Sequence, residues 1–230
     1  VRFVCHFHGW QDHVAFGAKG GVAAGPVPGV LDGIIENVVL IEPGNEDLMR
    51  ETLSSRDDIA GVILEPTGAS FGQIPVTREF VAALRDATTE NDTLLLFDEV
   101  VTGFRVSSGG AQGHYGITPD LTSLAKILSG GLPGGAVCGR ADILELLDFE
   151  VAEQKGFQKI GHQGTYNANP MSAIAGVAAL KEIRSGGVCE RASENGAKIR
   201  NQMNKMFSEE NVPWAAFGDH SAWYVYTNPE

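Results

Sequence analysis

The hydrophobic positions of this chain fall into short continuous runs separated by amphipathic segments. Apolar runs at residues 59–66 and 93–97 predict strands covered on both faces, because a strand with one face in water alternates apolar and polar positions. Between them, residues 77–91 predict a helix with Thr77 as its N-cap and apolar side chains at helical spacing. This order predicts a right-handed parallel crossover, and hence an α/β fold with a mostly parallel sheet flanked by helices.

Two glycines interrupt the pattern near the end of the chain. Gly186 and Gly187 separate two long helical segments, so we expect a large domain at residues 1–184 and the start of a small C-terminal α+β domain at residues 185–230. Further strands are predicted at residues 1–5, 38–41, 119–125 and 222–227, helices at residues 45–54, 141–147, 171–184 and 189–207, and glycine-rich loops at residues 17–37 and 99–118.

Composition restricts the possible partners. The net charge of −12 argues against a nucleic-acid or anionic-membrane surface, which needs clustered Lys and Arg, so we expect small molecules or other proteins as partners. No apolar run approaches the roughly 20 residues that a membrane helix needs. Cys5, Cys138 and Cys189 are too widely spaced for a zinc site or a disulfide framework, which favours a reducing, cytoplasmic location. The chain starts without Met and starts and ends in strand-like segments, so we expect a piece of a longer protein.

Two polar residues stand out at the ends of predicted strands. Asp98 closes the run at residues 93–97, and Lys126 follows the strand at residues 119–125 in a glycine-rich frame. The carboxyl ends of neighbouring parallel strands meet at one edge of a sheet, where ligands gather. A carboxylate and an amine there suit pyridoxal phosphate, whose ring nitrogen needs an anion and whose aldehyde needs an amine. We expect burial to desolvate Lys126 and favour its neutral form.

Each of these residues also has a purely structural explanation. A strand-ending aspartate is often a satisfied carboxylate, and a loop lysine is usually a solvated charge, so the hypothesis rests on their joint occurrence. His6, His8 and His13 lie close to Asp12 but match no metal-ligand spacing, so we predict hydrogen-bonded loop histidines and no metal site.

Several separated segments resemble one known family. Residues 97–105, 109–122 and 126–135 are similar to class III aminotransferases of fold type I, and closest to the branch that contains glutamate-1-semialdehyde 2,1-aminomutase. The segments Phe7-His8-Gly9-Trp10, Leu64-Glu65-Pro66 and Gly164-Thr165-Tyr166-Asn167-Ala168-Asn169-Pro170 match the same family in the same order. The resemblance covers essentially the whole chain and implies the large domain of a fold type I pyridoxal-phosphate enzyme.

The resemblance also implies roles for single residues. Lys126 is expected to form the Schiff base and to carry the proton between substrate and cofactor, and Asp98 to bind the ring nitrogen. Val100 and Phe7 are expected to sandwich the ring. Thr165 is expected to reach the phosphate of the partner subunit, because the family forms homodimers with the cofactor at the interface.

Other positions depart from the family pattern or leave the function open. His8 joins the cofactor-binding set through its motif, and Ser70 is left to bind the phenolic oxygen of the ring because Val101 cannot. Arg105 is a candidate for binding a substrate carboxylate. The family's phosphate loop precedes the position of Val1, so weak cofactor affinity is expected. We expect a transaminase acting on a small amine and keto acid or aldehyde; the alternatives are a glutamate-1-semialdehyde-type aminomutase and a truncated, non-catalytic scaffold.

Overall fold

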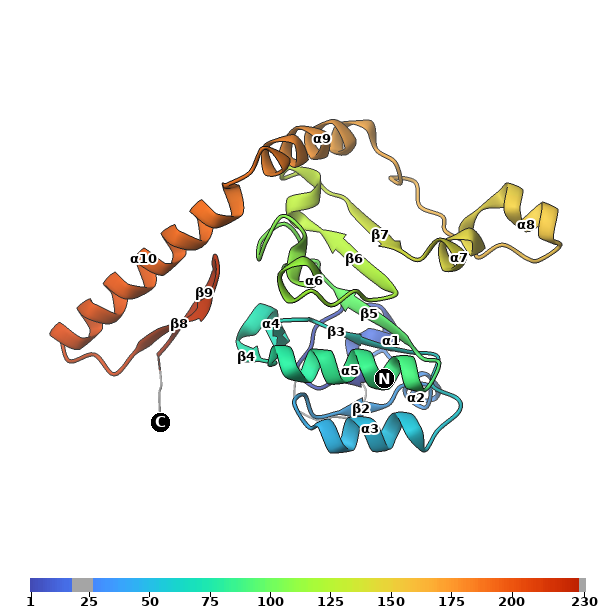
Figure 1. Ribbon diagram of the computed structural model, residues 1–230, viewed down its shortest axis with the longest axis horizontal. Coiled ribbons are helices and arrows are strands. Elements are labelled where there is room, and N and C mark those ends of the chain that lie inside the picture. Colours follow the sequence, from blue (N-terminus) through green and yellow to red (C-terminus); the bar gives the residue numbers. More distant parts are fainter. Residues whose placement is uncertain (18–26, 228–230) are drawn as a thin grey trace.

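A six-stranded sheet organises the first two thirds of the chain. The structure is a computed structural model that describes residues 1–17 and 27–227. The strand order is β2-β1-β3-β5-β6-β7; the first five run parallel, and β7 is antiparallel to β6 (Figure 1). This confirms the predicted α/β fold with a mostly parallel sheet. The strands are β1 (Arg2–Phe3), β2 (Leu40–Ile41), β3 (Gly61–Leu64), β5 (Leu94–Asp98), β6 (Leu121–Ala125) and β7 (Gly135–Gly139).

Two amphipathic helices form the core with this sheet. α3 (Glu46–Ser54) and α5 (Arg78–Glu90) lie side by side below the sheet in Figure 1 and direct their apolar faces at it. The predicted cap of α5 is present, since Thr77 Oγ1 accepts a hydrogen bond from Phe80 N at 3.2 Å. The buried core contains Phe3, Met49, Leu64, Phe80, Leu84, Leu95 and Phe97. The crossover from β3 through α5 to β5 therefore has the predicted order.

Several short elements were not predicted. The expected loop at residues 99–118 contains helix α6 (Gly110–Tyr115), and the expected helix at residues 141–147 is divided into α7 (Ala141–Leu144) and the 3-10 turn η2 (Glu145–Leu147). Part of the loop predicted at residues 17–37 lies outside the described residues. The other short elements are α1 (Asp12–Ala15), α2 (Asp32–Ile35), α4 (Ala69–Gly72), β4 (Ile74–Pro75), η1 (Lys126–Ser129) and α8 (Phe149–Lys155).

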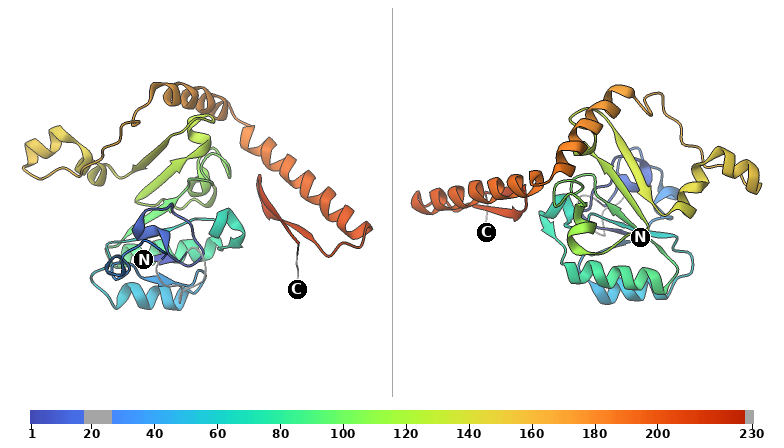
Figure 2. Two further views of the ribbon diagram at one scale, coloured as in Figure 1. Left: turned by 180° about the vertical axis from the view of Figure 1, so that it is seen from behind. Right: turned by 45° about the horizontal axis from the view of Figure 1, so that its top comes forward.

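The C-terminal part extends away from the sheet. α9 (Pro170–Ser185) packs over η1, and α10 (Val188–Glu209) continues outward with the hairpin β8 (Ala215–Asp219) and β9 (Ala222–Tyr226) along its side (Figure 2). The side chain of Asn204 on α10 binds both backbone groups of Ala216 on β8, at 2.7 and 2.8 Å. The predicted domain division falls between α9 and α10 and stays a prediction. Within the described ranges, no helix is both long and apolar enough to cross a bilayer.

Candidate active site

Asp98 lies buried at the carboxyl end of β5 with three hydrogen-bond donors around it. His8 Nδ1 lies 2.7 Å from Oδ2, while Ser123 Oγ and Val100 N donate to Oδ1 at 3.2 and 3.1 Å. Among the described residues, no arginine or lysine pairs with this carboxylate. A carboxylate has about four lone-pair positions, so Oδ2 can still accept one further hydrogen bond. Asp98 is thus a fixed anion able to receive a cationic N–H group.

The parallel register brings Lys126 near this carboxylate. Asp98 on β5 pairs with Ser123 on β6, and Lys126 begins η1 three residues later, with a left-handed φ of 50°. Its side chain is exposed within the described chain. The prediction that burial desolvates Lys126 is therefore wrong for this chain, because the residue lies exposed at the start of η1. Its predicted position at the neighbouring strand end is correct.

The segment after β1 supplies the predicted aromatic and a buried histidine. Cys5 has a left-handed φ of 67°, and His6 N closes a turn to Phe3 O at 3.3 Å. This turn leaves the Phe7 residue 59% exposed, whereas the side chain of His8 is only 1% exposed and faces Asp98. Phe7 thus offers an exposed aromatic ring, and His8 holds the Asp98 carboxylate from within the fold.

Glu65, which follows β3, ties two of the predicted site residues together. Its buried Oε1 accepts hydrogen bonds from Phe7 N at 2.9 Å and from Ser70 N at 3.0 Å. Ser70 also has a left-handed φ of 49°, and its backbone oxygen accepts a hydrogen bond from the Tyr224 hydroxyl on β9. Burial, with the nearby charge of Glu65, raises the pKa of Tyr224 to about 12, so the hydroxyl keeps its proton. The C-terminal hairpin therefore contacts the edge of this site.

Glu99 organises the loop that follows Asp98, and the sequence analysis missed it. Its fully buried carboxylate accepts hydrogen bonds from Thr102 Oγ1, Ala111 N and Gln112 N at 2.8, 2.6 and 3.0 Å. The last two donors are N–H groups of the first turn of α6, which have no partner within the helix and therefore favour a nearby anion. A Gly-Gly-Ala sequence that opens a helix shortly after an Asp-Glu pair was the available signal. Glu99 supports the site indirectly by fixing this loop.

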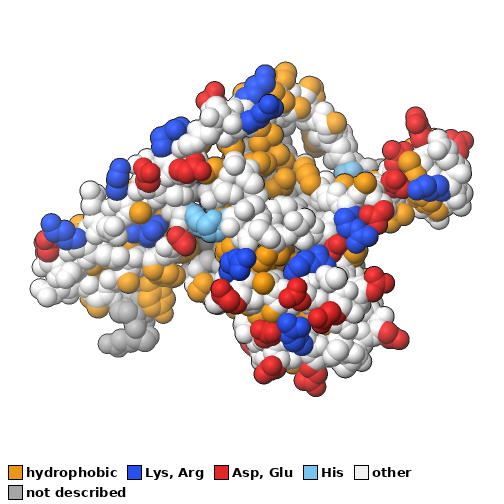
Figure 3. Space-filling view, in the orientation of Figure 1, with side chains coloured by type: hydrophobic (Ala, Val, Ile, Leu, Met, Phe, Trp, Pro, Cys, Tyr) orange, Lys and Arg blue, Asp and Glu red, His pale blue; other side chains and the backbone are white. Residues whose placement is uncertain are grey.

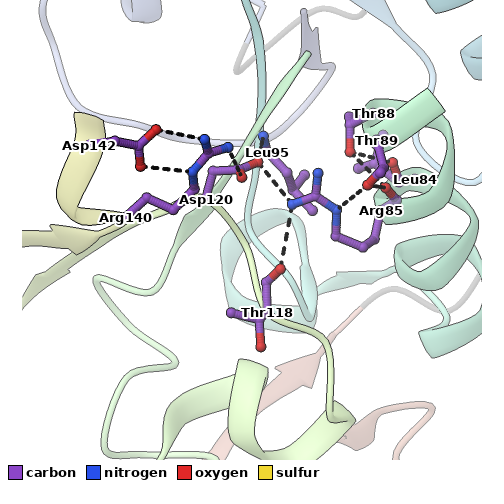
Figure 4. Close-up of polar contacts among 9 residues, drawn as sticks. All are labelled: Leu84, Arg85, Thr88, Thr89, Leu95, Thr118, Asp120, Arg140 and Asp142. Atoms are coloured by element: carbon purple, nitrogen blue, oxygen red, sulfur yellow. Dashed lines mark hydrogen bonds and ion pairs between the residues drawn. The ribbon is translucent and has the colours of Figure 1, made fainter. Parts of the chain in front are cut away.

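A second buried aspartate, Asp120, shows what a structural carboxylate looks like in this fold (Figure 4). Arg85 and Arg140 lie 2.9 and 3.0 Å from its two oxygens, and Leu95 N donates at 2.8 Å. Burial alone would raise the pKa of Asp120, but the bonds from Leu95, Arg85 and Arg140 outweigh it and hold the pKa below its usual value. Asp120 lies at the end of the sheet opposite Asp98 and is paired with two arginines, whereas Asp98 is paired with no arginine or lysine of the described chain.

Thr165 and Arg105 make no polar contact with Asp98 in the described part of the chain. Thr165 lies exposed on the segment between α8 and α9. Arg105 donates from Nε to Val101 O at 3.2 Å and from Nη1 to Ser221 Oγ at 3.1 Å, so it fastens the C-terminal hairpin to the loop after β5. Among the described residues, no cluster of three or more His, Cys, Asp or Glu side chains could hold a metal ion.

The residues around Asp98 fit one end of pyridoxal phosphate. Asp98 offers an anion with a free lone pair, Lys126 an accessible amine, and Phe7 an exposed aromatic face. His8 and Ser123 keep the carboxylate in place. This donor set suits a flat ring with a protonated nitrogen and an aldehyde.

Comparison with known proteins gives a consistent result. Residues 37–214 match the family described as "Aminotransferase class-III". A glutamate-1-semialdehyde 2,1-aminomutase from Caldivirga maquilingensis is 41% identical over 204 residues, covering 86% of this chain and 46% of the relative. An omega-transaminase from Sphaerobacter thermophilus superposes with a TM-score of 0.87 at 27% identity, covering 100% of this chain and 53% of that one. A transaminase with pyridoxal phosphate bound superposes with a TM-score of 0.86 at 29% identity, covering 99% of this chain and 53% of that chain.

These matches agree with the α/β fold of this chain. The chain spans about half the length of the relatives it matches. The matched family region contains Asp98, Val100, Lys126 and Thr165. The chain belongs to the class III aminotransferase family.

Proposed function

We propose that this chain is the cofactor-binding part of a pyridoxal-phosphate enzyme that moves an amino group within one substrate molecule, in the manner of the glutamate-1-semialdehyde aminomutases. The proposal rests on the buried Asp98, which pairs with no arginine or lysine among the described residues, and on the accessible Lys126 that follows the neighbouring strand. The chain is also 41% identical to a protein of that name. When bound, pyridoxal phosphate supplies an electron-withdrawing ring that stabilises negative charge on the amine-bearing carbon of the substrate.

The residues of this chain have separate tasks in this proposal. Asp98 binds the ring nitrogen and keeps its proton in place, because an ionised carboxylate next to an N–H cation favours the charged form of both. His8 and Ser123 orient Asp98. Lys126 supplies the amine that holds the aldehyde and then carries a proton to and from the substrate carbon. Phe7 and Val100 cover the two faces of the ring and exclude water from it.

Association with a second copy would complete the phosphate end. Thr165 remains our candidate for contacting the phosphate of a partner subunit, and its exposed position in this chain supports that role. An exposed apolar stripe on α9 supports such a homodimer: Met171 and Ile174 are 67% and 70% exposed, and Figure 3 shows hydrophobic side chains gathered over α9. Ser70 remains our candidate for the phenolic oxygen of the ring.

Covalent trapping tests the proposed role of Lys126. The chain is incubated with pyridoxal phosphate, reduced with borohydride, digested, and the labelled peptide identified by mass spectrometry. We expect the label on Lys126, its loss in Lys126→Ala, and its full retention in the control Lys198→Ala, which changes an exposed lysine of α10. Equal labelling of the chain and Lys126→Ala would show that the assignment is wrong.

A transaminase acting between two molecules is the second candidate, favoured by the superposition on an omega-transaminase. A semialdehyde substrate supplied without any second keto acid separates the two, since only a mutase completes repeated turnovers. A folded chain that neither retains the cofactor nor labels at Lys126 would instead indicate the non-catalytic scaffold.

A further inference from the structure

Two buried imidazoles lie behind Asp98, and each has one ring nitrogen without a partner. His6 is fully buried, and its Nδ1 accepts a hydrogen bond from Glu65 N at 2.9 Å. The side chain of His8 faces Asp98 through Nδ1. Within the described residues, His6 Nε2 and His8 Nε2 are both buried and make no hydrogen bond. Buried polar atoms without a partner are rare because each costs about 1–3 kcal/mol.

The known hydrogen bonds determine which of these nitrogens carries a proton. Because His6 Nδ1 accepts a hydrogen bond from Glu65 N, a neutral His6 carries its proton on Nε2. Burial is the main cause that lowers the pKa of His6 to about 3, so this ring is neutral at pH 7. Asp98 Oδ2 can only accept, so His8 Nδ1 donates to it, and in the neutral form of His8 the other nitrogen, Nε2, keeps a lone pair. With both rings neutral, the two unpartnered atoms are a donor and an acceptor.

The two rings do not bond directly. Their centroids are 6.1 Å apart at an interplanar angle of 48°, and no hydrogen bond joins them. A group that bonds to both Nε2 atoms must accept a hydrogen bond from His6 and donate one to His8. Arg2, whose Nε and Nη2 are also buried without a partner, can only donate. Water both accepts and donates.

We infer that one buried water molecule bridges His6 Nε2 and His8 Nε2, which makes His6 a positioning residue for Asp98. Every hydrogen bond then points the same way, from Glu65 N through His6, the water and His8 to the carboxylate. Hydrogen bonds aligned in this manner polarise one another, so the relay strengthens the last donor to Asp98. The bridge itself needs no cofactor; only its benefit for the ring nitrogen rests on the proposed function.

The substitution His6→Asn isolates the bridge from the rest of the site. The asparagine oxygen can replace Nδ1 as acceptor for Glu65 N, but no atom replaces Nε2. In the cofactor-free chain labelled with ¹⁵N-histidine, we expect NMR to show the Nε2–H tautomer of His6 and the Nδ1–H tautomer of His8. In His6→Asn, loss of one hydrogen bond behind His8 should speed solvent exchange of the His8 Nδ1 proton about five- to tenfold. His13→Asn, which changes an exposed histidine of α1, should leave that rate unchanged.

A crystal structure of the unsubstituted chain gives an answer even where His6→Asn does not fold. We expect an ordered water within about 3.2 Å of both Nε2 atoms. Density without that water, an Nε2–H tautomer of His8, or an unchanged exchange rate in folded His6→Asn would each overturn the inference. Borohydride labelling of Lys126 reports on the proposed function separately, so a failure of one does not resemble a failure of the other.

Discussion

Substituting asparagine for each of the two buried aspartates of the sheet should have different effects on stability and on cofactor retention. Asp120→Asn removes the charge that Arg85 and Arg140 bind, and it leaves one oxygen where the chain now uses two. Charge-assisted hydrogen bonds contribute about 1.5–3 kcal/mol when buried, and exposed ion pairs up to about 1 kcal/mol. The side chain of Arg85 is 22% exposed and that of Arg140 is 52% exposed, so Arg85 accounts for most of the loss. We expect Asp120→Asn to lower the free energy of unfolding by about 2–4 kcal/mol.

Asp98→Asn should cost less stability and abolish cofactor retention. The amide oxygen can still accept from Val100 N and Ser123 Oγ, and only the charge-assisted contact with His8 is lost. We expect a loss of about 1–2 kcal/mol. Urea unfolding followed by circular dichroism measures both variants, and borohydride labelling of Lys126 measures cofactor retention. Under conditions in which the Asp120→Asn variant is folded, its Lys126 should be labelled to the same extent as Lys126 of the unsubstituted chain.

The pH dependence of the free energy of unfolding in acid tests the same assignment of Asp120. The pKa of Asp120 is lowered in the folded state, so its stabilisation is fully present above its unfolded-state pKa of about 3.9 and is lost as the pH falls through the folded value. The unsubstituted chain should therefore lose stability more steeply below about pH 4 than Asp120→Asn does. Equal acid slopes, or a smaller loss of stability in Asp120→Asn than in Asp98→Asn, would refute the assignment of Asp120 as the structural carboxylate.

Two further substitutions test the loop and the hairpin around the site. Gly110→Ala places a Cβ against Glu99 Oε2 at a φ of 67°, so we expect thermal unfolding to show a loss of about 2 kcal/mol or more. Gly113→Ala, whose Cβ meets only Ser107 Oγ at 3.5 Å, should cost less than half as much, and equal losses would contradict the role of Glu99. Tyr224→Phe removes the hydroxyl that binds Ser70 O, so amide hydrogen exchange in β9 should speed up about fivefold, and unchanged protection there would show that this contact does not hold the hairpin.

The sequence predicted those elements whose signals are local and agree with one another. β3, α5 and β5 combine a continuous apolar run, a capped amphipathic helix and a second run, so period, cap and order all indicate one crossover. Asp98 was predicted for the same reason, because a strand end fixes the edge of the sheet. α6 was missed because it contains two glycines and is flanked by two more, and it is held by Glu99, 11 residues before Gly110, rather than by its own propensity.

The contacts that make Asp98 a site depend on residues distant in sequence. His8 reaches Asp98 across 90 positions and Ser123 across 25 positions, and no pattern along the chain encodes such a distance. The burial predicted for Lys126 was wrong for a related reason, because an apolar strand before a residue says nothing about which elements cover it. Side chains at strand ends can thus be located from sequence, whereas their environments are set by packing between segments.

Comparison of Asp98 with Asp120 also shows that the candidate site lacks a stabilising ion pair that the fold uses elsewhere. Asp120 is held by two arginines and a backbone N–H group, while Asp98, equally buried, is bonded within the described chain to His8, Ser123 and Val100 N alone. A buried carboxylate without a cation is costly, and a protein can reduce that cost either by supplying an arginine or by aligning dipoles toward the charge. An arginine would occupy Oδ2 and exclude any ligand. The aligned donors behind Asp98 stabilise the charge and leave that oxygen accessible to a cationic ring nitrogen.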